Sequence, residues 1–212
     1  MPILIRRLLL ALLACVLPLA VVQAADPTAP PPFQEGKDYR RLPNPVPTSA
    51  PGQPEVVELF SYTCPHCRSL QPAVKEWLAR KPEEVVFVKY ALALGAAWEP
   101  SARAYYAAQA LGVLETTHQP LFDAIHRDKR PLNGEDELAA FFAEHGVDQD
   151  AFRKAYTSFQ TETQLRRARQ LAQRYGVRGV PVVIVNGEYE VRSPQVFEVV
   201  DFLLARDAAP QK

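Results

Sequence analysis

The chain has 212 residues, and its 24 basic and 24 acidic side chains give it no formal net charge at neutral pH. This balance provides no basic footprint for nucleic acid, so we expect no nucleic-acid partner. After the first 24 residues, no apolar run reaches the roughly 20 residues that a transmembrane helix needs, so the rest of the chain is expected to be soluble.

Residues 1–24 have the layout of a secretory signal peptide. Two arginines open the segment, an apolar run follows over 8–22, and "VQA" supplies small residues for cleavage after Ala24. A membrane anchor is the alternative, but the run is short for a span and Pro18 interrupts it. We therefore predict export to the periplasm and a mature chain of 188 residues, which has 22 basic and 24 acidic side chains.

Cleavage after Ala24 removes Cys15. That cysteine lies in "LLAC", which loosely resembles a lipoprotein processing box, but the residues after it stay hydrophobic, whereas a mature lipoprotein is expected to turn polar. The mature chain then holds two cysteines, Cys64 and Cys67, in an oxidising compartment.

The first half of the mature chain contains the expected strands and helix around these cysteines. Residues 25–54 are crowded with proline and predict an extended N-terminal arm, in which 35–42 supplies one short strand. "PEVVELFSY" at 54–62 is typical of a buried strand, the spacing over 65–80 predicts a helix, and 83–92 predicts a second strand. The cysteines therefore lie at a strand-to-helix junction inside a βαβ unit.

A helical block follows, with Gly, Pro or Asp at the expected turns. Its predicted helices cover 100–112, 119–128, 133–146 and 148–159. We therefore expect an inserted all-helical domain over 98–160.

The last part of the chain returns to a mixed pattern. A long helix is predicted over 161–177, and "VPVVIVNGEYEV" predicts a β-hairpin that turns at Asn186-Gly187. Ser193 is the expected N-cap of a final helix, with Pro194 at its first position. The expected class is α/β, with residues 55–97 and 161–212 forming one domain around the insertion.

Three structural explanations of the Cys64–Cys67 pair are weak. A zinc site needs four ligands, and the sequence has no second C-x-x-C. A c-type haem needs histidine directly after the second cysteine, where this chain has Arg68. A structural disulfide that closes so small a loop constrains the unfolded chain little.

The histidines offer little help to a metal site. His145 precedes a glycine and fits a helix C-terminus, His126 fits an amphipathic helix, and His118 lies near an expected turn. We interpret these three as structural or solvated, and we predict no metal site.

A redox pair has a physical mechanism in this sequence. Thiolates are favoured at helix N-termini and beside cations, and Cys64 comes just before the helix that opens at Pro65. A protonated His66 adds positive charge beside it. We expect Cys64 to be the exposed attacking sulfur and Cys67, one turn inward, to resolve the mixed disulfide.

Two charges interrupt the predicted strands on either side of that helix. Glu58 lies in "VVELF" and Lys89 in "VVFVKY", both near the carboxyl ends where an open α/β sheet places its chemistry. They are either exposed edge residues or a partly buried acid–base pair that transfers protons near Cys67. The sequence leaves both interpretations open.

The stretch "GVRGVPVVIVNG" places Pro181 at the start of a strand. An ordinary trans proline is permitted there, and cis X-Pro bonds are a minority in folded proteins. The pattern alone therefore predicts no cis bond.

Taken together, these motifs resemble the DsbA family of thiol:disulfide interchange proteins. The resemblance covers 33–205 and rests on four segments: "EGKDYRRL", "VVELFSYTCPHC", "VKY" and "VRGVPVVIVNGEY". It implies a thioredoxin-like fold with an inserted all-helical domain. It also implies a cis Pro181 beside the disulfide, a Val180 backbone that pairs with substrate peptide, and Glu58 and Lys89 in the family's buried charged positions.

One departure from the family lies after the CPHC motif. The family often has an aromatic residue and then an acid at this point, whereas this chain has Arg68 and Gln71. We expect a more positive rim around the site, with Arg68 equally consistent with a solvated helix residue.

The resemblance implies a monomeric periplasmic disulfide oxidase with the motif Cys64-Pro65-His66-Cys67. It would oxidise unfolded exported proteins, and a DsbB-like membrane quinone reductase would reoxidise it, with no dissociable cofactor. A reductase or isomerase on the same fold is one alternative, and a metal-binding chaperone is another.

Overall fold

The computed structural model describes residues 32–208. The predicted signal peptide, with Cys15 and the expected cleavage at Ala24, lies outside this range. Five strands form one mixed sheet in the order β1-β5-β4-β2-β3, in which β2 and β3 are parallel and the other neighbours are antiparallel. The strands are β1 (Tyr39–Arg41), β2 (Glu55–Phe60), β3 (Val86–Ala91), β4 (Val182–Val185) and β5 (Tyr189–Val191).

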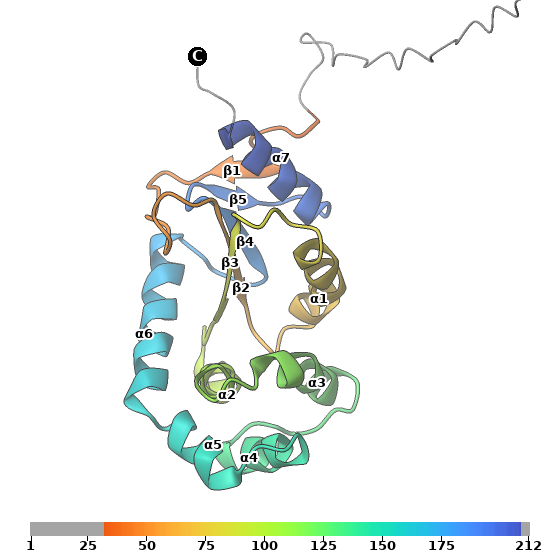
Figure 1. Ribbon diagram of the computed structural model, residues 1–212, viewed down its shortest axis with the longest axis vertical. Helices are drawn as coiled ribbons and strands as arrows, with labels where there is room; N and C mark the ends of the chain where they lie inside the picture. Colours follow the sequence, from red (N-terminus) through yellow and green to blue (C-terminus); the bar gives the residue numbers. More distant parts are fainter. Residues whose placement is uncertain (1–31, 209–212) are drawn as a thin grey trace, which may run out of the picture. The chain divides into compact units, whose positions relative to one another are not determined.

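Helices cover both faces of the sheet (Figure 1). α1 and α7 lie on one side and α6 on the other, whereas α2 to α5 follow β3 in the chain and form the predicted helical block. Their bounds are α1 (Pro65–Leu78), α2 (Glu99–Ala110), α3 (Leu114–His126), α4 (Glu135–Glu144), α5 (Gln149–Tyr156), α6 (Phe159–Arg174) and α7 (Val196–Ala208), with a short 3-10 helix at Ala96–Trp98. No helix within 32–208 is both long enough and apolar enough to span a bilayer.

Alternation along β2 divides the core between the two faces of the sheet. Val56 packs with Trp77 of α1 and Phe197 of α7, and these two rings stack with centroids 5.1 Å apart. Val57 and Leu59 belong to the second cluster, which includes the inward faces of α2, α3 and α6. The predicted order of strand, βαβ unit, helical block, long helix and ββα is confirmed.

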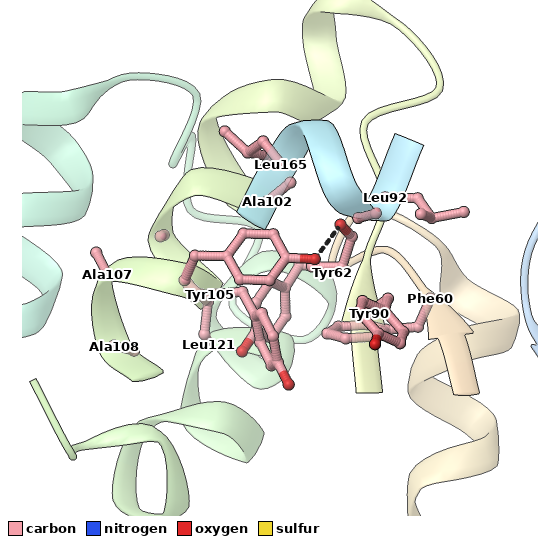
Figure 2. Close-up of a cluster of buried hydrophobic side chains, with 14 of the residues drawn as sticks. Phe60, Tyr62, Tyr90, Leu92, Ala102, Tyr105, Ala107, Ala108, Leu121 and Leu165 are labelled. Carbon is pink, nitrogen blue, oxygen red and sulfur yellow. Dashed lines mark hydrogen bonds between the residues drawn. The ribbon is translucent and has the colours of Figure 1, made fainter. Parts of the chain in front are cut away.

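The second cluster is rich in aromatic rings where β2 and β3 end (Figure 2). Phe60 makes edge contacts with Tyr62 and Tyr105, at centroid distances of 5.3 and 5.2 Å. Tyr106 donates a hydrogen bond to the backbone oxygen of Ala91 at 3.0 Å. This cluster packs the helical block against the end of the sheet that carries the cysteines.

Two predicted helix starts are wrong. α3 begins at Leu114 instead of residue 119, so Pro120 lies inside the helix; its first turn is retained because Thr117 is fully buried and donates to the Val113 carbonyl at 2.8 Å. α7 begins at Val196, after Ser193 and Pro194, and the Ser193 hydroxyl instead accepts from the Gln195 amide at 3.2 Å.

The predicted hairpin turn at Asn186-Gly187 is confirmed. Both residues have positive φ, 51° and 66°, and the Glu188 amide donates to the Val185 carbonyl across the turn at 2.9 Å. This geometry suits asparagine and glycine, which tolerate the left-handed region. The turn joins β4 to β5, and the antiparallel pairing of β4 with β2 puts Pro181, just before β4, at the end of the sheet that carries Cys64.

Candidate active site

Cys64 lies at the junction between β2 and α1, as predicted. It is the N-cap residue of α1, with extended backbone, and its Sγ accepts a hydrogen bond from the Cys67 amide at 3.4 Å. Pro65 follows at the first helical position, where its missing N–H costs the helix nothing. The free amides and dipole of the helix N-terminus therefore act directly on the Cys64 sulfur.

The two sulfurs differ in their access to solvent. Cys64 is 7% exposed and Cys67 is fully buried, so Cys64 is the more accessible of the two but is less exposed than we expected. Burial raises the pKa of the Cys67 thiol far above its usual value, and a backbone hydrogen bond with Ser61 only partly opposes this rise. Cys67 is therefore held as a neutral thiol in the reduced protein.

The loop before β4 closes over Cys64. The Val180–Pro181 peptide bond is cis, as the resemblance implied. The Val180 carbonyl oxygen accepts from Cys64 Sγ at 3.4 Å, which brings the loop and the sulfur into contact. Beside this contact lies a groove of about 550 Å³ with exposed His66 on its edge. Its apolar lining includes Leu70, Pro181, Val183, Val191, Pro194 and Val196.

Glu58 and Lys89 form a largely buried ion pair and not an exposed strand edge. They are directly opposite each other in the parallel register of β2 and β3. Glu58 is fully buried, the Lys89 side chain is 14% exposed, and Lys89 Nζ lies 3.2 Å from Glu58 Oε2. That carboxylate oxygen nevertheless accepts no hydrogen bond within the described structure, so it keeps a free lone pair.

Gln71 is not a residue of the rim. Gln71 is buried, and its Nε2 donates both to Glu58 Oε1 at 2.9 Å and to the Cys67 carbonyl at 3.1 Å. Because Gln71 follows Cys67 by four residues, helical periodicity puts both on the inward face of α1. It therefore connects the Glu58 carboxylate to the backbone of Cys67 inside the protein.

Arg68 is also not a freely solvated residue. Its Nε and Nη2 lie 3.1 and 2.9 Å from Asp123 Oδ1 of α3. The ion pair offsets the positive charge that we expected at the rim. It also ties the helix that carries the cysteines to the helical block.

His118 belongs to the site, although we interpreted it as structural or solvated. Its Nδ1 lies 2.7 Å from Tyr62 Oη, and its Nε2 lies 3.0 Å from Lys89 Nζ and 3.1 Å from Gln71 Oε1. Burial and the Lys89 charge together lower the pKa of His118 well below its usual value. The side chain therefore extends the buried polar cluster as a neutral imidazole.

His126 and His145 have local structural contacts, in agreement with their interpretation. His126 Nε2 lies 2.7 Å from the Tyr62 carbonyl oxygen, and His145 Nδ1 lies 2.8 Å from the Phe141 carbonyl oxygen at the end of α4. Within residues 32–208, no three histidine, cysteine or acidic side chains are arranged to hold a metal ion.

Comparison with known proteins assigns the family. A model of the DSBA-like thioredoxin domain matches residues 94–204. The thiol:disulfide interchange protein DsbA of Azotobacter vinelandii is 38% identical over 213 residues, which cover 97% of this chain and 100% of that protein. The DsbA of Pseudomonas aeruginosa is 36% identical over 196 residues, covering 90% of each chain.

Solved structures agree with the sequence relatives. The crystal structure of Pseudomonas aeruginosa DsbA has a TM-score of 0.78 at 35% identity and covers 82% of this chain and 94% of its own. The oxidoreductase DsbA of Xylella fastidiosa has a TM-score of 0.78 at 36% identity and covers 82% of this chain and 97% of its own. The chain therefore belongs to the DsbA family of thiol:disulfide interchange proteins, and it is a thiol-disulfide oxidoreductase with a thioredoxin-like fold and a helical insertion.

Proposed function

We propose that this oxidoreductase donates its Cys64–Cys67 disulfide to newly exported, unfolded proteins in the periplasm. The observation that carries the proposal is the asymmetry of the pair. Cys64 caps the N-terminus of α1 and is partly accessible to solvent, whereas Cys67 is fully buried. A substrate thiolate can reach only the first sulfur. The capping position and the cation of a protonated His66 favour the reduced form of Cys64, which makes the disulfide oxidising.

The exchange proceeds in two steps. A substrate thiolate attacks Cys64 Sγ, the Cys64–Cys67 bond breaks, and Cys67 leaves with the electron pair and takes up a proton. A second substrate thiolate then attacks the substrate sulfur of the mixed disulfide and releases Cys64 as a thiolate. The substrate loses two electrons to the cysteine pair, so the reaction requires no dissociable cofactor.

Glu58 is the group that we assign to the proton of Cys67. Its carboxylate raises the pKa of the Cys67 thiol, so the two groups interact electrostatically. Its Oε2 has a free lone pair, and Lys89 supplies the compensating charge at 3.2 Å. Glu58 can thus accept the proton when Cys67 attacks and return it when Cys67 leaves.

The cis Pro181 loop and the neighbouring groove are the proposed substrate site. The Val180 backbone lies against Cys64 and would pair with an extended peptide, and the apolar groove beside His66 would take its side chains. We further propose that the protein acts as a monomer and that a DsbB-like membrane quinone reductase reoxidises it.

The test is equilibration of the Cys64–Cys67 pair with glutathione buffers, combined with oxidation of a reduced, unfolded two-cysteine peptide. We expect a disulfide far more oxidising than that of thioredoxin, and stoichiometric peptide oxidation. A potential near about −270 mV would contradict disulfide donation and favour a reductase. Retention of stoichiometric copper or zinc without peptide oxidation would favour the metal-binding chaperone.

A further inference from the structure

Both ring nitrogens of His118 face polar groups, and these groups determine where its proton lies. A Lys89 ammonium can only donate, and the Gln71 Oε1 that it contacts at 2.7 Å can only accept. Nε2 lies 3.0 Å from Lys89 Nζ and 3.1 Å from Gln71 Oε1, and we assign it the lone pair because that oxygen already accepts from Lys89 at a shorter distance and an ammonium cannot accept. The remaining proton of the neutral ring is on Nδ1, from which it is donated to Tyr62 Oη at 2.7 Å.

This tautomer completes the set of acceptors around Lys89. The ammonium donates to Gln71 Oε1 and His118 Nε2, and its charge faces Glu58 Oε2 at 3.2 Å. The ammonium thus has two hydrogen-bond acceptors, and its third contact, with Glu58 Oε2, is an ion pair without a hydrogen bond. Loss of one acceptor at a largely buried cation is costly, since a partly buried charge needs its hydrogen bonds.

We propose that His118 is a positioning residue for the thiol–disulfide reaction: its Nε2 holds the Lys89 ammonium against Glu58 and so keeps the Glu58 carboxylate ready to take the proton of Cys67. The proposal rests on the proton-transfer role assigned to Glu58 above. His118 touches neither sulfur in this arrangement and acts only through Lys89.

Among the groups around His118, Lys89 and Glu58 are the charges that determine its electrostatic environment. Tyr62 and Tyr105 are neutral, because burial raises the pKa of each phenol. The remaining charged groups are at the edge of a groove of about 980 Å³ that His118, Lys89 and Gln71 also line. They are Arg68 and Lys75 of α1 and Glu115 of α3. Arg68 is already paired with Asp123.

The experiment follows the intramolecular step in which Cys67 resolves a mixed disulfide. The reduced protein is treated with oxidised glutathione, which leaves one glutathione on Cys64. In the resolving step, Cys67 gives its proton to Glu58, its sulfur bonds to Cys64, and glutathione leaves as a thiolate. The first-order rate of this step is measured by rapid mixing as a function of pH.

Two conservative variants distinguish the role of Nε2 from the role of Nδ1. In His118→Gln the amide oxygen replaces Nε2 as acceptor for Lys89. We therefore expect the same dependence of the resolving rate on pH as in the unmodified protein. In His118→Asn the amide reaches only the Nδ1 position, so the profile midpoint should rise by about one pH unit, with a roughly tenfold slower rate on its acidic side. Once Nε2 no longer holds Lys89, its positive charge stabilises the Glu58 carboxylate less.

His118→Leu should shift the profile at least as far as His118→Asn, and His126→Leu is the matched control. His126 lies on the same helix, and its Nε2 contacts the backbone oxygen of Tyr62. It has no hydrogen bond with Lys89. Its replacement perturbs the packing of α3 and should leave the midpoint unchanged. If His118→Leu does not fold by circular dichroism, the comparison between glutamine and asparagine is sufficient.

Two results overturn the proposal. One is a shared midpoint for the glutamine and asparagine variants, and the other is an equal shift in His118→Leu and His126→Leu. A Glu58→Gln variant measured alongside separates this failure from that of the proton-transfer role. If Glu58→Gln changes the profile and the His118 variants do not, only the role of His118 is wrong.

Discussion

At the scale of single residues, the two sulfurs have different roles in the reaction because their surroundings differ. Cys64 has the helix N-terminus and the remaining exposure, whereas Cys67 has neither and is kept protonated by burial. In a Cys67→Ala variant, we expect a stable mixed disulfide at Cys64 with a substrate whose cysteine is already in a disulfide with thionitrobenzoate: the Cys64 thiolate attacks the substrate sulfur, and thionitrobenzoate leaves. The product is detected by mass spectrometry under non-reducing conditions.

The reciprocal variant, Cys64→Ala, is the control for this trapping experiment. Its remaining sulfur is fully buried, so we expect mixed-disulfide formation at least about a hundredfold slower, which is of the order by which positioning alone changes such rates. Similar labelling of both variants would mean that the nucleophile is assigned to the wrong cysteine.

Glu58 gives a second prediction at this scale. Glu58→Gln retains an oxygen for Gln71 but removes the base, so the resolving step should slow by about 10²-fold, the lower end of general acid–base catalysis. Its dependence on pH should flatten in the same measurement. Glu55→Gln is the matched control, because Glu55 is a buried carboxylate on the same strand that bonds to Ser49 instead. An unchanged Glu58→Gln profile would contradict the proton-transfer role.

The chemistry of the site could be predicted from the sequence only where its residues are close in the chain. The CPHC motif shows both sulfurs and the helix that follows them. Gln71 carried a usable signal, since i+4 spacing from Cys67 places it on the same helix face, but its polar side chain suggested solvent. His118 carried none: it is on α3, and only the tertiary fold brings it to Lys89.

At the scale of elements, the hairpin turn provides a test of backbone geometry. Gly187 has a φ of +66°, and a Cβ there would lie 1.9 Å from the Val46 carbonyl oxygen. The Val46 amide also donates to the Gly187 carbonyl at 2.9 Å, so the two backbones cannot separate freely. Gly187→Ala should lower the free energy of unfolding by about 3 kcal/mol, because strain and clash add together.

Gly52→Ala is the control for Gly187→Ala. Gly52 has a φ of +83°, but no atom lies within 4 Å of an added Cβ. Gly52→Ala should therefore lower the free energy of unfolding only by the cost of a non-glycine residue in the left-handed region, about 1–2 kcal/mol. Urea unfolding of both variants gives the comparison, and equal losses would show that contact with Val46 is unimportant.

Most elements could be predicted because their signals are local. Continuous runs of β-branched and aromatic residues identified β2 and β3, and the Asn-Gly pair identified the hairpin. The start of α3 could not be predicted, because Pro120 is normally a helix boundary, and the turn before it is mostly exposed apart from the buried Thr117. The start of α7 failed for a related reason: a serine followed by proline suits a helix start, but the Ser193 hydroxyl bonds to Gln195 in a turn before the helix.

At the scale of the whole molecule, the buried polar cluster couples the site to folding. Tyr62, Gln71, Lys89 and His118 come from the end of β2, from α1, from β3 and from α3, so the cluster exists only when the sheet and the helical block are both in place. The neutral, partly buried imidazole of His118 then makes the stability of the fold depend on pH. The unfolded chain can protonate His118, whereas the folded protein resists this.

The sign of that dependence follows from the lowered pKa of His118 in the folded protein. Below the ordinary value of 6.5, the unfolded state binds a proton that the folded state does not, so stability falls as the pH falls. Between pH 7 and pH 5 this residue should account for a loss of at most about 2 kcal/mol, the value for a ring that stays neutral throughout. The remaining titratable groups contribute equally to a His118→Gln variant, which should therefore lose up to about 2 kcal/mol less over the same interval. Urea unfolding of both proteins at pH 5, 6 and 7 measures the difference. Parallel losses would mean that the folded protein takes up the same proton, and the ring would then be unable to accept from Lys89.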